Sequence, residues 1–289
     1  MYLALFLCFT CFVVIKGIKG GIEKFSKMVM PLLFFLVVAI AVNSLMLPGS
    51  QKGVEFLLKP DFSKVTAETC LNALGQAFFS LSIGCGTIMT YASYVSKNEN
   101  IALTSSLTGL FDTLFALIAG LAIMPAVFAY GIGAGRGPAL VFLALPKVFQ
   151  QMPMGQFFAI IFFVAVLFAG ITSLINMMEA VAESWEKNFN INRKVAVLVS
   201  CALALGVGVF IEAEPKVGAW MDFVSIIITP FGAVLGAISI YYILGWDEIR
   251  KELEQGHGKL SEMFGTVAKY LYVPLTVIIM VLGLIYGGL

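Results

Sequence analysis

Charged residues are scarce in this chain of 289 residues: Asp, Glu, Lys and Arg make up only 12% of it, whereas 60% of the residues are hydrophobic. A soluble domain is usually about a quarter charged. The composition therefore excludes an ordinary soluble protein and predicts a polytopic membrane protein. The formal net charge of +1 also gives no electrostatic reason to expect a nucleic acid as a partner.

Histidine and cysteine are also few, with one histidine and five cysteines. His257 lies in a polar loop and cannot build a metal site alone. Cys8 and Cys11 have the CxxC spacing of redox pairs and of half zinc sites, but no second CxxC and no nearby histidine accompany them. We interpret the cysteines as small buried hydrophobic residues. The sequence shows no Ser/His, Cys/His or paired-carboxylate arrangement within its apolar runs, so we predict that the chain is not an enzyme.

Long apolar runs dominate instead, and most are long enough to cross a bilayer as helices. They cover about residues 1–17, 28–47, 71–95, 101–126, 156–182, 194–210, 220–245 and 270–286. We predict an all-α membrane protein with eight transmembrane helices in a single domain. Of the 18 Lys and Arg residues, 12 fall in the loops of one side and 6 in those of the other, which places the N-terminal end of this chain outside. We expect no cleavable signal peptide, because the first run lacks a small-residue cleavage site.

The third apolar run, Leu71–Val95, carries no charge, yet its centre is a poor place for a continuous helix. The segment Ser80–Gly86 contains two serines, which offer the backbone alternative hydrogen bonds, and two glycines, which leave helical dihedrals without steric cost. A helix broken near the membrane midplane is typical of a transporter's binding site. Close helix packing through small residues is the alternative interpretation.

Polar groups inside two other runs are candidates for ion binding. Asp112 lies in the middle of its span, where a carboxylate is costly and is a functional candidate, although a protonated, hydrogen-bonded carboxyl is an alternative. Thr172 and Ser173 follow Ala169 by three and four residues, on one helix face. If Gly170 loosens the helix, the Ala169 carbonyl and both hydroxyls converge as three neutral oxygens suited to a hard cation. Ordinary interhelical hydrogen bonding is again the alternative.

Three further carboxylates lie towards the ends of spans. We expect Glu179 and Glu183 to be ion-paired or hydrated. Asp222 opens the seventh run at the outer surface, where it is either a helix N-terminal carboxylate favoured by the dipole or a gate residue that needs a basic partner. In the same run, Thr229 and Pro230 predict a kink.

The stretch Gly75–Tyr94 resembles the sixth span of the neurotransmitter:sodium symporter family. The match covers the Phe78–Phe79 pair, both serines, the Gly-x-Gly break and the Thr-Tyr-x-Ser-Tyr ending. Lys59–Phe62 resembles the Pro-Asp-Phe motif before that span, Ala169–Ser173 the eighth span and Met221–Phe223 the tenth. The resemblance runs along essentially the whole chain, from the fourth span to the eleventh, as in the eleven-span bacterial members.

The resemblance implies a fold of two inverted five-span repeats from which the first three spans are missing. Residues 1–47 would be the last two spans of the first repeat, residues 67–245 the second repeat and residues 270–286 an eleventh-type span. It also implies sodium-coupled uptake of an amino acid by alternating access, with sodium ions as the coupling ions. The lipid bilayer and an amino acid are the implied partners, and the short loops favour a bacterial inner membrane.

The resemblance further implies the positions of the sites. One sodium site would use Ser80 and Asp112, shared with the substrate carboxylate, and a second would use the Ala169 carbonyl, Thr172 and Ser173. The substrate would contact Phe79, Ser80, Ser82, Cys85, Ser173 and Met177. Gln76, Phe79 and Asp222 would form the outer gate and Tyr94 would belong to the cytoplasmic gate. The apolar pocket wall predicts a neutral, hydrophobic or aromatic substrate.

Two departures from the family pattern carry predictions. Many members have Asn where this chain has Asp112, and those members often need chloride; a fixed carboxylate supplies that charge, so we predict transport independent of chloride. The missing first three spans share both sodium sites, so we expect this chain alone to bind sodium and substrate poorly or not at all. The alternatives are an inert truncated remnant or a non-transporting membrane partner, and, from another class, a membrane-embedded enzyme or receptor.

Overall fold

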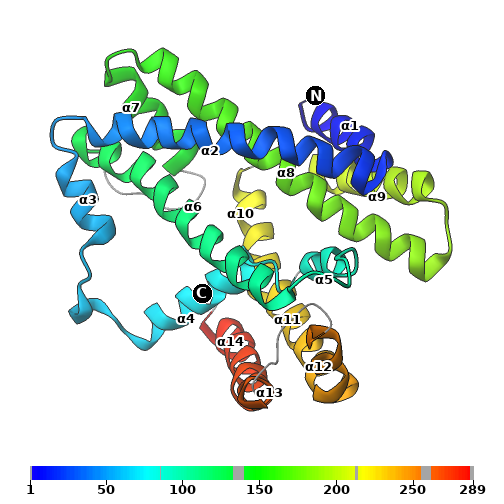
Figure 1. Ribbon diagram of the computed structural model, residues 1–289. Coiled ribbons are helices and arrows are strands. Elements are labelled where there is room, and N and C mark those ends of the chain that lie inside the picture. Colours follow the sequence, from blue (N-terminus) through cyan, green and yellow to red (C-terminus); the bar gives the residue numbers. More distant parts are fainter. Residues whose placement is uncertain (1, 85, 133–139, 212–213, 255–261, 287–289) are drawn as a thin grey trace. The chain divides into compact units, whose positions relative to one another are not determined.

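The computed structural model describes residues 2–84, 86–132, 140–211, 214–254 and 262–286, and every regular element among them is a helix. In chain order the elements are α1 (Tyr2–Ile15), η1 (Ile18–Ile22), α2 (Glu23–Leu45), α3 (Gln51–Leu58), η2 (Phe62–Lys64), α4 (Ala67–Ser80), α5 (Thr87–Ala92), α6 (Ile101–Ala129), η3 (Leu140–Ala144), α7 (Leu145–Gln151), α8 (Gly155–Phe189), α9 (Arg193–Ile211), α10 (Glu214–Phe223), η4 (Val224–Ile228), α11 (Thr229–Ile238), η5 (Ser239–Leu244), α12 (Trp246–Glu254), α13 (Glu262–Val267), η6 (Ala268–Tyr272) and α14 (Val273–Tyr286) (Figure 1). The prediction of an all-α fold is confirmed for the described residues.

Six helical stretches of the described chain are long and apolar enough to cross a membrane. They are Ile18–Leu45, Ile101–Ala129, Gly155–Phe189, Arg193–Ile211, Lys216–Leu244 and Met263–Ile285. They correspond to six of the eight predicted spans. The first predicted span forms α1, a shorter apolar helix of 14 residues, and the third is divided between α4 and α5. The structure therefore supports a multi-pass membrane protein with six long spans, and the total of eight stays a prediction.

The chain forms two compact units. Unit 1 consists of Met1–Cys11, Ser63–Leu110 and Asn176–Leu289, and unit 2 of Phe12–Phe62 and Phe111–Ile175. The implied repeat boundaries lie at other positions, and that division stays a prediction.

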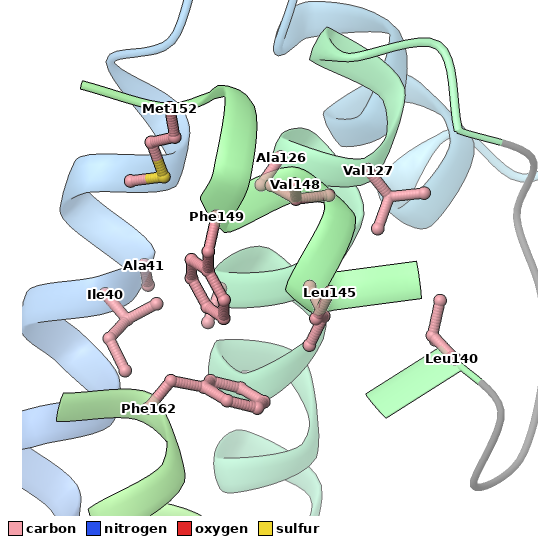
Figure 2. Packing of buried hydrophobic residues seen from close by; sticks show 11 residues of the cluster. Ile40, Ala41, Ala126, Val127, Leu140, Leu145, Val148, Phe149, Met152 and Phe162 are labelled. Atoms are coloured by element: carbon pink, nitrogen blue, oxygen red, sulfur yellow. The ribbon is translucent and has the colours of Figure 1, made fainter. Parts of the chain in front are cut away.

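Unit 2 has an apolar core in which aromatic rings interlock (Figure 2). Its buried residues come from α2, α6, η3, α7 and α8 and include Ile40, Val127, Leu145, Val148, Phe149 and Phe162. The ring centroids of Phe149 and Phe162 are 5.6 Å apart. Pro146 near the start of α7 suits its position, because the first turn of a helix needs no donor from that residue. The core of unit 2 is thus held by close packing of side chains from several helices.

Unit 1 is organised around α4, α11 and α14, which pack against one another. α4 begins at a capping box, in which the Thr66 hydroxyl accepts from the Thr69 amide at 3.2 Å and the Thr69 hydroxyl accepts from the Thr66 amide at 3.3 Å. α11 follows a π-helical turn, η4, and has Pro230 in its first turn. Proline lacks an amide donor, which disturbs the regular ladder just before it. The helix type therefore changes where the kink at Thr229 and Pro230 was predicted, and the kink itself stays a prediction.

The interpretation of the cysteines needs a correction. Of the four described cysteines, Cys11 is buried and Cys201 is half-buried, but Cys8 and Cys70 are exposed, and all four are free thiols. Cys8 and Cys11 lie three residues apart on the apolar helix α1 and still differ in burial. A small apolar side chain needs no protein neighbour on a helix surrounded by lipid, because lipid tails are as apolar as the protein interior. The fifth cysteine, Cys85, lies outside the described residues.

Candidate functional site

The third predicted span is interrupted at its centre. α4 ends at Ser80 and α5 begins at Thr87, so the break predicted between Ser80 and Gly86 is confirmed. Ser82 has φ +55° and Gly86 has φ +72°, a conformation that glycine adopts without steric cost and that is uncommon for serine. The predicted substrate contact Cys85 lies outside the described residues. The break removes backbone groups from the regular helical ladder, as in the binding segment of a transporter.

The glycines of the break also pack closely, so both interpretations of them apply. A methyl group placed on Gly84 would overlap the carbonyl of Thr229, and one placed on Gly232 would overlap the carbonyl of Gly84. The unwound segment therefore lies directly against the backbone of α11, and only glycine leaves room for this contact. The position of the break in unit 1 is fixed by α11.

A cavity of about 390 Å³ lies beside α4 in unit 1, within the range of about 300–1,000 Å³ typical of small-molecule sites. Gln76, Phe79 and Met177, three of the predicted site residues, line it together. Most of the wall is apolar, and Asn72 and Ser225 add polar groups to that of Gln76. An apolar cavity with a few polar groups suits a small ligand that has an apolar side chain.

Other predicted residues of unit 1 lie outside the lining of this cavity. Ser80 and Ser82 follow the α4 residues that line it, and the exposed Asp222 lies next to the lining residue Met221. The structure thus brings Gln76 and Phe79, two of the three residues predicted for the outer gate, to one cavity. It does not place Asp222 in that cavity, and the gating role of Asp222 stays a prediction.

Tyr94, the predicted cytoplasmic gate residue, contacts a buried ion pair. Its hydroxyl donates to Oε1 of Glu179 at 3.2 Å, and Glu179 is fully buried. Arg193 donates from one guanidinium nitrogen to Oε1 at 3.1 Å and from the other to Oε2 at 2.5 Å, the two-pronged geometry that favours arginine–carboxylate pairs. Glu183 pairs with Lys187 at 2.5 Å. The expectation that Glu179 and Glu183 are ion-paired or hydrated is confirmed as ion pairing.

The remaining predicted sodium ligands lie in unit 2. Thr172 is buried, and its hydroxyl lies 2.9 Å from the Phe168 carbonyl and 3.0 Å from the Ala169 carbonyl. Helix α8 continues without interruption through Gly170, so the loosening on which the convergence of the three oxygens depended is not seen, and Ser173 is exposed. A glycine inside a long apolar helix keeps the ladder when nothing else replaces its hydrogen bonds.

Asp112 is half-buried on α6 in unit 2, whereas Ser80 belongs to unit 1. The sodium site that would join these two residues stays a prediction, as does the second site.

Sequence reasoning missed Trp220, which lines the cavity, Arg193, which pairs with the Glu179 that Tyr94 contacts, and Asn176, which accepts from Tyr91. Arg193 is the first residue of α9 and reaches Glu179 across the turn after α8. No helical spacing connects two residues on different helices, so periodicity could not reveal this pair. The tyrosine content of the stretch after the break was the available signal for Asn176, because a buried tyrosine hydroxyl usually has a partner.

Comparison with known protein families shows to which family this chain belongs. The model of the Sodium:neurotransmitter symporter family matches residues 1–286. The chain belongs to this family. The resemblance inferred from the broken span is therefore confirmed, and so is the prediction that the chain is not an enzyme, because this is a family of transporters.

The chain is similar to several prokaryotic members of the symporter family. It is 37% identical over 294 residues to the sodium-dependent transporter YhdH of Bacillus subtilis (strain 168), covering 97% of this chain and 65% of that protein. It is 40% identical over 199 residues to a sodium-dependent transporter of Haemophilus influenzae, covering 69% of this chain and 44% of that protein. The chain thus spans less than two thirds of the length of these symporters.

The same fold occurs in a solved structure. The crystal structure of MhsT in complex with L-phenylalanine matches with a TM-score of 0.83 and 31% sequence identity, covering 97% of this chain and 66% of that one. The symporter fold extends over nearly all of the present chain.

Proposed function

We propose that this chain is the larger part of a sodium-coupled secondary transporter that takes up a neutral, hydrophobic or aromatic amino acid by alternating access. The observation that carries the proposal is the mainly apolar cavity of about 390 Å³ beside the broken helix, lined by Gln76, Phe79 and Met177. The bacterial inner membrane is the proposed location, since the relatives YhdH and the Haemophilus influenzae protein are bacterial.

The chemistry of the cavity supports an apolar amino-acid side chain as the ligand. Phe79 and Met177 offer an aromatic ring and a flexible thioether, which adapt to apolar groups of different shape. A charged side chain would lose its hydration among these groups without gaining an ionic partner. MhsT was crystallised with L-phenylalanine, and a substrate of this kind suits the cavity wall described above.

Sodium is the proposed coupling ion, held at one site by Ser80 and Asp112 and at a second by the Ala169 carbonyl, Thr172 and Ser173. Support for the second site is the buried position of Thr172, whose hydroxyl also hydrogen-bonds to the Ala169 carbonyl at 3.0 Å. Neutral oxygen ligands suit a small hard cation.

The proposal is tested by uptake into proteoliposomes with an inward sodium gradient. Two proteins are compared: the 289-residue chain, and the same chain extended by any in-frame coding sequence that precedes it in the gene. We expect the extended protein to take up radiolabelled phenylalanine or leucine only with sodium, and the shorter chain to show little or no uptake.

Phe79→Ala supplies the variant for this test, and Phe111→Ala, an exposed position on α6, is its matched control. The first should weaken uptake of an aromatic substrate and the second should not. Uptake driven equally well by potassium, or a preference for lysine or glutamate, would contradict the proposal.

A further inference from the structure

Hydroxyl groups at the end of α5 meet a single stripe of acceptors on α8, all within unit 1. The Tyr91 hydroxyl donates to Oδ1 of Asn176 at 2.6 Å and the Tyr94 hydroxyl donates to Oε1 of Glu179 at 3.2 Å. The acceptors Asn176, Glu179 and Glu183 are separated by three and four residues, so they share one face of α8 over about two helical turns. We call these contacts the hydroxyl ladder.

Glu183 is the third acceptor of the hydroxyl ladder and lies nearest to the C-terminal end of α8. Its Oε1 lies 3.3 Å from the Ser93 hydroxyl, which also donates to the Thr90 carbonyl at 2.7 Å. Lys187, four residues further along α8, pairs with the same Glu183 oxygen at 2.5 Å. The Glu183 side chain is only 8% exposed. The lysine therefore orients an almost buried carboxylate towards the end of α5.

The other half of the broken span is held differently. α4 borders the mainly apolar cavity, and its contacts to α11 and α14 are helix packing. Among the described residues between the halves, Ser82 and Gly86 have positive φ. Packing contacts of this kind are not directional, whereas hydrogen bonds are directional and have to break before the groups separate. Release of α5 from α8 therefore requires the hydrogen bonds of the hydroxyl ladder to break.

We propose that Asn176 and Glu183 are positioning residues that hold the end of α5 on α8, and that their bonds break when the cytoplasmic side opens; the second part rests on the transport function proposed above. Asn176 contacts Tyr91 of α5 and Glu183 contacts Ser93, the residue after α5, and neither contact involves Tyr94 or Glu179. Tyr94 is then one of three points of attachment, and the cytoplasmic gate extends over the whole stripe.

Hydrogen exchange tests the first part on the 289-residue chain in lipid nanodiscs, without sodium or substrate. Asn176→Leu and Glu183→Leu should each speed exchange of the peptide covering residues 87–95 by roughly five- to tenfold, the effect expected for loss of one buried hydrogen bond. Peptides of α9 and α14 should exchange as before, and the melting temperature should stay close to that of the unaltered chain, because the effect is local. Destabilisation of the whole fold would instead speed exchange of the α9 and α14 peptides as well and lower the melting temperature.

Matched controls lie on the same helix. Asn188→Leu and Glu186→Leu remove residues of the same types whose contacts are to Ser184 and Arg193 rather than to α5, and they should leave the exchange of α5 unchanged. Asn176→Asp and Glu183→Gln keep an acceptor oxygen and should restore slow exchange. Tyr91→Phe combined with Asn176→Leu should give no more than either change alone, since both remove the same bond.

The proposal is overturned if α5 exchanges at the same rate in Asn176→Leu and Glu183→Leu as in the unaltered chain, or if the controls speed it equally. The gating part is tested by uptake per mole of the extended protein: Tyr91→Phe should change the maximal rate and leave the substrate concentration at half-maximal rate unaltered. An unchanged maximal rate, with α5 exchange raised, overturns gating. Absence of uptake by the unaltered extended protein instead contradicts the proposed function, and the exchange result still decides whether the ladder holds α5.

Discussion

The interiors of the two units are built from different chemistry. Unit 2 is held by apolar side chains, with Leu145, Val148 and Phe149 of α7 packed among residues of α2, α6 and α8. Unit 1 contains a fully buried carboxylate, Glu179, whose two oxygens are held by Arg193. Both units belong to the same membrane protein, so the contrast is between an interior held by apolar packing and one that contains a buried ion pair.

Lipid gives little hydrophobic reason for helices to associate, because its tails are as apolar as leucine. The core of unit 2 therefore depends on close packing, which tolerates only one arrangement well. The polar groups of unit 1 are costly when unpaired but can exchange protein partners for water when a path opens. The difference suggests that motion is concentrated in unit 1, around the break and the hydroxyl ladder.

The largest effect is expected from Arg193→Leu. This change leaves Glu179 buried without its cation, and breaking one side of a buried ion pair costs about 3–5 kcal/mol. We expect a large fall in melting temperature and much less monodisperse protein, measured by thermal unfolding followed by size-exclusion chromatography. The double variant Glu179→Gln with Arg193→Leu should recover much of the loss, because no charge then stays buried.

Lys251→Met is the control for that change. Lys251 and Glu248 are paired at 2.6 Å, but their side chains are 68% and 58% exposed, and an exposed pair contributes less than about 1 kcal/mol. Equal falls in melting temperature in Arg193→Leu and Lys251→Met would show that burial of the Arg193–Glu179 pair does not determine its contribution to stability.

A smaller effect is expected from Leu145→Ala in the core of unit 2, where Leu145 is 2% exposed. Leaving a cavity at a buried leucine costs about 2–5 kcal/mol in soluble proteins. We expect about 2–3 kcal/mol here, because the leucine side chain also finds apolar surroundings in the membrane. Leu143→Ala, at a position 57% exposed, should change the melting temperature little, and a similar loss at both positions would contradict a packed core.

The sequence predicts only part of this contrast. The break at Ser80–Gly86 and the long spans follow from local composition, since serine, glycine and apolar runs act over a few residues. Either ion pairing or hydration of Glu179 was expected, but its partner Arg193 was not, because it belongs to another helix. Gly170 shows the limit of local reasoning: a glycine permits a break, and the neighbouring sequence decides whether one forms. Trp220 reaches the cavity only through the packing of α10, which no spacing within one helix reveals.

The smallest effect, none at all, is expected from removing chloride. Asp112 places a half-buried carboxylate on α6 of unit 2. If this carboxylate neutralises a sodium ion, no mobile anion is required, since a fixed charge close to the ion contributes the same attraction without being bound from solution. Sodium-driven uptake by the extended protein should therefore be the same in chloride and in gluconate. Asp112→Asn removes the charge but keeps the shape, and should make uptake depend on chloride. Loss of uptake by the unaltered protein in gluconate would contradict this role, and so would an Asp112→Asn variant that transports equally in both anions.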